Sequence, residues 1–284
     1  MHTNTLLVAW VLLSVVTVWA APPASRPVAG THSSPPPRLG VPYASTAPRG
    51  RAEPDDPAWV HASLIPALTP SLSTEAGLPA PLGTEVRLLW DEQFLYVRFT
   101  CQSDSLYAPF HGRDADHYKG DVVEVFLDPK ADGREWVELE VTPENQVLDQ
   151  ITLLTADPRS GPDLRLVPEV YPRDAWTFRE WNLEGLKTEV SQQKQDGKLI
   201  GWTVDLALPA KPLLKRLAKS RYEADLTMRL NLMRYDYKPA TDPTAPRNLS
   251  AMNWAPVIRG CPHFSPEAMG YITLLPRQRD GTRP

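Results

Sequence analysis

A polar loop followed by a short strand contains the residues best suited to binding chemistry. Residues 111–121 are rich in histidine and aspartate, include Tyr118, and lead directly into the apolar run 122–127. Alternation along that run places three aliphatic side chains on one face, so Glu124 points the other way together with Phe126. Such a carboxylate can accept hydrogen bonds from adjacent sugar hydroxyls while an aromatic ring packs against the sugar's C–H face. A solvated acid on an edge strand is the alternative interpretation.

Signatures of common enzyme classes are absent from the sequence. It has no Gly-x-Ser-x-Gly turn, no phosphate-binding glycine loop and no His-Glu-x-x-His helix. Glu124 with Glu138 or Glu140 is the carboxylate pair that would support the alternative of a glycoside hydrolase. Alternation predicts, however, that Glu138 and Glu140 lie on the solvent-facing side of their strand. We therefore expect a non-catalytic binding function.

The composition indicates a soluble globular protein that does not bind nucleic acid. Of the 284 residues, 42% are hydrophobic, which is enough for one large core or two small ones. Thirty Lys and Arg residues against 34 Asp and Glu residues give a net charge of −4. No broad positive field is therefore available to hold a phosphate backbone.

The N-terminus has the features of an export signal. An apolar run from Leu6 to Trp19 is followed by Ala20 and Ala21, so we predict a signal peptide over residues 1–20. The run is shorter than the 18 to 20 or so apolar residues that span a bilayer comfortably, and an uncleaved anchor is the alternative. We expect a secreted, periplasmic or cell-surface protein with no other membrane contact.

A change of composition marks the next boundary. Residues 21–52 are rich in Pro, Ala and Ser and contain no acidic residue, which predicts a disordered tether. The folded domain is then expected over residues 53–277, with a short tail over 278–284.

Short alternating segments separated by turn residues predict an all-β fold, an antiparallel two-sheet β-sandwich of jelly-roll type. Leucines at helical spacing predict one short helix from Lys211 or Pro212 to Lys219. The predicted strands are 86–90, 94–101, 122–127, 136–142, 147–154, 186–191, 202–208, 226–234 and 271–275.

The sequence has two cysteines, Cys101 and Cys261. Both follow the predicted signal peptide, and an exported protein can form a disulfide. Two separate buried thiols are the alternative, and the sequence leaves both open.

Six segments in order resemble the family 9 carbohydrate-binding modules and their stand-alone relatives. The resemblance implies a β-sandwich that binds oligosaccharide or polysaccharide, in association with carbohydrate catabolism, and we expect a monomer. The segments are Leu89–Val97, Arg113-Asp114 with Gly120–Pro129, Glu138–Pro143, Gly201–Pro209, Leu230–Arg234, and Asn253–Pro256 with His263–Gly270.

The resemblance also implies roles for particular residues. Tyr118, six residues before Glu124, takes the place of the first of two tryptophan platforms that hold a terminal sugar, and Trp254 is the candidate for the second. Asn253 is the candidate amide for hydroxyl groups.

Two further residues have two interpretations each. Arg98 shares a strand face with aromatic residues, so it either points at the sugar or bridges to an acid. Trp136 either joins the site or covers a second small core.

Cofactor expectations depend mainly on the resemblance, which implies a structural calcium ion. Its candidate ligands are Asp114, Asp121, Asp128 and Asp132, which offer hard oxygen atoms of the kind Ca²⁺ takes. An ordinary hairpin turn is the alternative for residues 128–133.

Related sandwiches hold haem through Met and His, so a haem-binding or protein-interaction domain is a second functional alternative.

Overall fold

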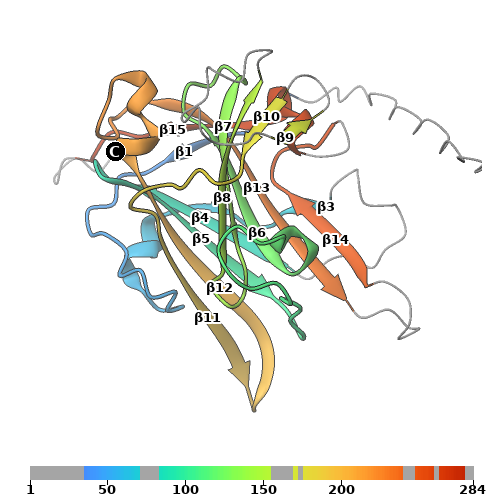
Figure 1. The fold of residues 1–284 in the computed structure, drawn as a ribbon. Coiled ribbons are helices and arrows are strands. Elements are labelled where there is room, and N and C mark those ends of the chain that lie inside the picture. Colours follow the sequence, from blue (N-terminus) through green and yellow to red (C-terminus); the bar gives the residue numbers. More distant parts are fainter. Residues whose placement is uncertain are drawn as a thin grey trace, which may run out of the picture.

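Two β-sheets packed face to face form the frame of the protein, as the computed structural model shows (Figure 1). This confirms the predicted β-sandwich. The residues that the structure describes are 35–70, 83–154, 169–171, 175–238, 247–258 and 262–278.

The larger sheet contains ten strands within the described residues. Its pairs are antiparallel except for the first and last strands in the chain, β1 and β15, which pair in parallel. The order along the sheet is β1 (Arg38–Val41), β15 (Gly270–Leu274), β13 (Thr227–Lys238), β6 (Val122–Asp128), β7 (Glu135–Val141), β8 (Val147–Leu154), β10 (Ala175–Phe178) and β9 (Glu169–Tyr171), while β14 (Asn248–Asn253) pairs with β13 and with β3 (Thr69–Pro70).

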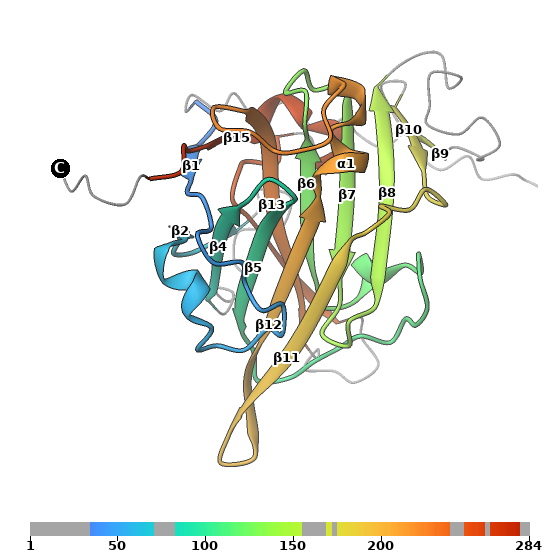
Figure 2. The same cartoon turned by 90° about the vertical axis from the view of Figure 1, so that its left-hand side faces the viewer.

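The smaller sheet has five strands in the described part of the chain, all antiparallel. Its order is β11 (Lys187–Gln195), β12 (Lys198–Pro209), β5 (Phe94–Gln102), β4 (Thr84–Trp90) and β2 (Ser63–Ile65). The hairpin of β11 and β12 runs past the ends of the neighbouring strands (Figures 1 and 2).

The main hydrophobic core lies between the sheets because alternate residues of each strand point inward. Val125 and Leu127 of β6 pack there with Val97 and Phe99 of β5, and all four side chains are fully buried. These are the faces that alternation predicts.

The predicted helix is shorter than expected. It consists of α1 (Ala210–Leu213) followed by a 3₁₀ turn at Lys215–Leu217. Ala218 ends the turn in a left-handed conformation, with φ of 55°. Among the described residues, no helix is long and apolar enough to cross a membrane.

The sandwich begins earlier in the chain than residue 53, so the predicted end of the tether is wrong. Strand β1 pairs with β15 at the sheet edge, and Val41 within it is fully buried. The backbone N–H of Ala52 donates to the buried Asp205 carboxylate at 3.0 Å. Residues 35–52 are therefore part of the domain, whereas residues 1–34 lie outside the described part of the chain.

Candidate functional site

A hollow of about 260 Å³ opens over the middle of the larger sheet, on the face turned away from the main core. We call it the glutamate pocket. Its lining residues are Tyr118, Glu124, Phe126, Glu138, Glu140, Leu148, Gln150, Arg179, Tyr235, Pro262 and His263.

The register of two neighbouring strands brings three carboxylates together. Glu124 of β6 lies directly opposite Glu140 of β7, and Phe126 lies opposite Glu138. Residues two apart on a strand share a face, so all three glutamates project from the sheet into one hollow. One carboxylate oxygen from each lies within 4.8 Å of those of the other two.

Both Glu138 and Glu140 are buried, 2% and 1% exposed, so the prediction that they face solvent is wrong. Residues far along the chain cover this face of the sheet. His263, in the 3₁₀ turn Pro262–Phe264, places its Nε2 against the Glu138 carboxylate, which also accepts from the Gln150 amide. Local alternation contains no signal for a cover that comes from more than a hundred residues away.

The three carboxyl groups differ in electrostatic environment. Burial and the neighbouring carboxylates raise the pKa of both Glu124 and Glu140 well above the usual value. Burial would raise the pKa of Glu138 too, but His263 and the Gln150 amide together bring it below the usual value. The Oε2 atom of Glu140 is buried and accepts no hydrogen bond from the described residues. The pocket therefore contains a buried acidic group with unused hydrogen-bonding capacity.

Tyr118 lies at the rim of the pocket, 37% exposed, on the 3₁₀ turn His117–Lys119. The Tyr237 hydroxyl donates to the Tyr118 carbonyl oxygen at 2.9 Å, which anchors the turn to β13. The turn needs glycine at position 120, because a Cβ atom there would lie 2.7 Å from the Tyr107 carbonyl oxygen. The predicted pair of Tyr118 and Glu124 thus does line one hollow.

Trp254, the predicted second platform, and Asn253, the predicted amide, do not line this pocket. Trp254 is partly buried against the main core, and a Cβ atom on Gly270 would lie 2.6 Å from its ring. The buried Asn253 amide donates to the Ala255 carbonyl oxygen at 2.7 Å. Trp254 therefore has a packing role in the fold, and Asn253 has a hydrogen-bonding role in it.

Trp136 belongs to a second small core, as one of its two interpretations predicts. It is fully buried on the outer face of the larger sheet with Phe126, Met233, Val257 and Met269. This cluster packs Val257 and Met269 onto the sheet beside the glutamate pocket.

Arg98 lies on the smaller sheet and does not line the glutamate pocket. Its guanidinium group donates to both carboxylate oxygens of Asp205, at 2.6 and 2.8 Å, and lies over the Trp59 ring. Arg98 therefore has the acid-bridging role of its two interpretations, in a buried pair.

The four predicted calcium ligands are not gathered into one site in the described structure, which groups only Glu124, Glu138 and Glu140 at metal-binding distances. Instead, their carboxylates accept backbone N–H groups. Asp128 accepts three, from Lys130, Ala131 and Gly133, as in an ordinary turn. The Asp132 carboxylate accepts from the Arg134 N–H, and the Asp114 carboxylate accepts from the Asp149 N–H. The Asp121 carboxylate accepts from the N–H groups of Tyr107 and Tyr237.

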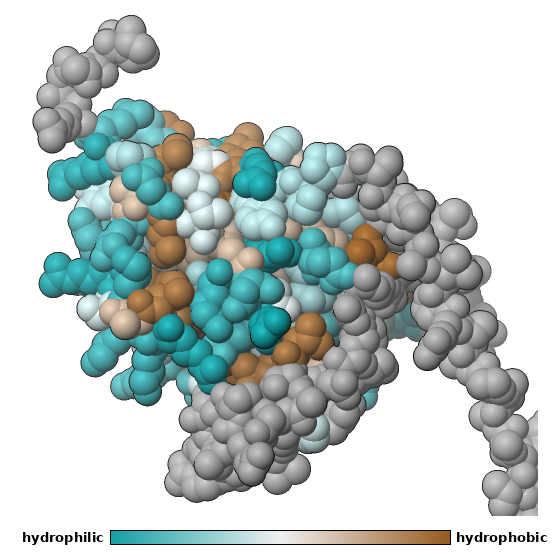
Figure 3. Space-filling model, turned by 90° about the horizontal axis from the view of Figure 1, so that it is seen from above, coloured by the Kyte–Doolittle hydropathy of each residue, from teal (hydrophilic) through white to brown (hydrophobic). Residues whose placement is uncertain are grey.

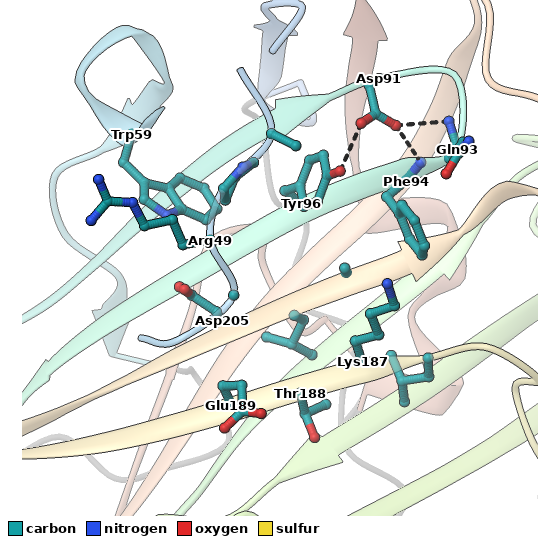
Figure 4. A pocket seen from close by; sticks show the side chains of 16 residues that line it. Arg49, Trp59, Asp91, Gln93, Phe94, Tyr96, Lys187, Thr188, Glu189 and Asp205 are labelled. Carbon is teal, nitrogen blue, oxygen red and sulfur yellow. Dashed lines mark hydrogen bonds between the residues drawn. The ribbon is translucent and has the colours of Figure 1, made fainter. Parts of the chain in front are cut away.

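A larger hollow, about 660 Å³, lies on the smaller sheet between β5 and β11 (Figure 4). Trp59, Phe94 and Tyr96 line it, so we call it the aromatic groove. Its buried acid, Asp205, is fully engaged by Arg98, and Asp91 accepts from the Tyr96 hydroxyl. Glu189, at the groove's β11 side, is exposed to solvent. Among the described residues, this groove has no buried carboxylate oxygen without a partner, whereas the glutamate pocket has one, on Glu140.

The sulfur-containing residues that the structure describes pack in the interior. Cys101 is buried, and burial raises the pKa of its thiol to about 11. Cys261 lies outside the described residues, so the disulfide stays a prediction. Met228 and Met252 pack in the main core, and Met233 and Met269 in the second one.

A family model described as "Carbohydrate family 9 binding domain-like" matches residues 52–144. The chain is similar to family 9 carbohydrate-binding domains. This match confirms the resemblance predicted from the sequence. The matched range contains Tyr118 and all three glutamates of the pocket, while His263 and Trp254 lie beyond it.

Two solved structures share the fold of this family 9-like chain. One, from Bacteroides uniformis and provisionally named a carbohydrate-binding protein, is 15% identical with a TM-score of 0.58, and the alignment covers 84% of this chain and 99% of that one. The other is a family 9 carbohydrate-binding module from Caldicellulosiruptor kristjanssonii in complex with cellotriose, 18% identical with a TM-score of 0.50, covering 87% and 98%. No curated protein matches the sequence. At these identities the structural likeness shows the β-sandwich fold.

Proposed function

We propose that this is an exported, non-catalytic protein that holds a sugar ring in the glutamate pocket. The observation that carries the proposal is a buried group of carboxyl groups beside an exposed tyrosine in one hollow. Sugar hydroxyls both donate and accept hydrogen bonds, so the glutamates and Gln150 can engage neighbouring hydroxyls. The Tyr118 ring supplies the flat apolar surface for the sugar's C–H face.

The family match and the size of the hollow support the same function. Both Tyr118 and Glu124 fall inside the range that matches the family 9 model. A volume of about 260 Å³ suits one sugar unit or a chain end rather than a long stretch of polysaccharide. The structural neighbour that carries cellotriose makes that sugar a reasonable first probe.

The arrangement of the carboxylates favours binding over hydrolysis. Glycoside hydrolases use two carboxyl groups that flank the scissile bond, at about 5–5.5 Å or about 6.5–9.5 Å. Here the three carboxylates project from one face of one sheet, with oxygens within 4.8 Å of one another. They would approach a sugar from one side only.

Export is proposed on the N-terminal sequence. The apolar run from Leu6 to Trp19 ends in small residues, as in a signal peptide. Release or retention of the mature domain at the cell surface would give it access to external glycans.

Titration calorimetry against a glycan panel that includes cellotriose tests the function. We expect saturable binding of at least one glycan, and Tyr118→Ala should weaken it at least tenfold, about 1.4 kcal/mol. Phe94→Ala is the matched control, because Phe94 is a partly buried aromatic residue of the aromatic groove. If Phe94→Ala weakens binding and Tyr118→Ala does not, the sugar binds in the aromatic groove and the assignment to the glutamate pocket is wrong.

A further inference from the structure

The glutamate pocket concentrates negative charge in a buried place. Glu124, Glu138 and Glu140 are each at most 2% exposed, and Glu124 faces Glu140 directly across the strand pair. Like charges at such a position repel, and buried charges are normally paired, neutralised or bound to a metal.

The cationic groups around the pocket only partly balance this charge. His263 contacts Glu138, and Arg179 donates to the Asp116 carboxylate at 2.6 Å. Among the described residues, no ion pair reaches Glu124 or Glu140 within 4.0 Å. Glu140 lines the pocket and is 1% exposed, and its Oε2 atom has no hydrogen-bond partner in the described part of the chain.

We propose that Glu124, Glu138 and Glu140 bind one hard divalent cation of the size of Ca²⁺, and that the ion coordinates sugar hydroxyls. The second part rests on the proposed function. Carboxylate oxygens are among the ligands that hard cations prefer.

The geometry fits the size of the ion. Ca²⁺ binds oxygen at about 2.3–2.6 Å, so two oxygens on one ion can be separated by up to about 4.6–5.2 Å. Three equally spaced oxygens on one ion lie at most about 4.0–4.5 Å apart. The three carboxylate oxygens, all within 4.8 Å of one another, can therefore reach one Ca²⁺ by small side-chain rotations, without movement of the strands. Mg²⁺, at about 2.0–2.1 Å, demands near-octahedral geometry and usually keeps several of its waters, which suits a site of three protein carboxylates less well.

The space in front of the carboxylates gives the ion a role in sugar binding. Three protein ligands would leave about three to five of the six to eight positions of Ca²⁺ open. The hollow of about 260 Å³ has room there for water molecules or for two adjacent hydroxyls of a sugar. An ion held in this way would bridge the ligand to carboxylates that repel one another without it.

Calcium titration of the whole exported chain, first treated with EDTA, tests the cation without any sugar. We expect one saturable site by calorimetry and a rise in melting temperature on addition of CaCl₂. Glu140→Gln and Glu124→Gln should each lower the calcium affinity at least tenfold, while remaining folded in EDTA. Asp132→Asn, in the 128–133 turn, is the control and should bind as wild type does.

The outcomes of these titrations separate the two proposals. Calcium binding that both glutamine variants retain, or that Asp132→Asn abolishes, overturns the cation site. So does the absence of both a calcium heat and a rise in melting temperature at millimolar calcium. If calcium binds as expected but no glycan does, the cation site stands and the proposed function fails. If a glycan binds, its affinity should fall at least tenfold in EDTA, and an unchanged affinity contradicts the bridging role.

Discussion

Glu140 illustrates how a single residue can be placed for function at the expense of stability. It lies in strand β7, where its buried carboxyl group faces Glu124 and has one oxygen that no described residue contacts by a hydrogen bond. A destabilising buried acid is typical of a binding site. A residue that packs better could replace it easily, so its presence indicates a function other than stability.

Glu140→Gln should therefore stabilise the ligand-free protein. The amide removes one of the facing charges and can donate to a neighbouring carboxylate, so the free energy of unfolding should rise by about 1–2 kcal/mol in EDTA. Urea unfolding measures it. Glu144→Gln, at a half-exposed glutamate outside the pocket, should change stability by less than about 0.5 kcal/mol. A clear loss of stability in Glu140→Gln would mean that the carboxylate has a favourable structural role.

At the scale of the elements, the hairpin turn between β6 and β7 fixes the register that aligns the glutamates. Asp128 organises this turn: it is fully buried, and its carboxylate accepts three backbone N–H groups. Gly133 in the same turn has φ of 70°, a conformation that favours glycine.

Asp128→Ala should cost about 2–4 kcal/mol of stability, because it leaves three backbone donors without their acceptor. Asp132→Ala removes a single acceptor, for the Arg134 N–H, and should cost less than about 1 kcal/mol. Chemical denaturation of both variants, in EDTA and in CaCl₂, decides this. Equal losses in EDTA would contradict the role given to Asp128, and a loss that appears only when calcium is present would show that the turn is a metal site.

The strands and their faces could largely be predicted from the sequence, whereas the burial of the outer face could not. The alternation of Val125 and Leu127 against Glu124 is local and was sufficient. Glu138 and Glu140 follow the same alternation, but their burial depends on Pro262 and His263, which local patterns cannot bring to them.

At the scale of the whole molecule, the N-terminal segment closes the edge of the larger sheet. Strand β1 has only four residues in a proline-rich stretch, and its partner β15 lies more than two hundred residues away. Composition therefore indicated a tether, because a parallel pair between the two ends of a domain leaves no local signal.

Apolar and hydrophilic side chains are interspersed on the face seen in Figure 3.

A chain that begins at residue 53 should accordingly be less stable than one that begins at residue 35. The shorter chain loses the fully buried Val41, the β1–β15 pairing and the N–H of Ala52 to Asp205, so we expect a loss of at least about 3 kcal/mol. Thermal unfolding of the two truncated proteins compares them directly. Equal melting temperatures would indicate that residues 35–52 are a tether, as composition predicted, and not part of the domain.

The most direct test of the central claim is a crystal structure of the protein with the glycan that binds best in the panel. We predict a sugar ring in the glutamate pocket, stacked on Tyr118, with its hydroxyls on Glu124 and Glu140 or on an ion between them. A sugar found in the aromatic groove against Phe94 and Tyr96, with the glutamate pocket free of it, would contradict the account.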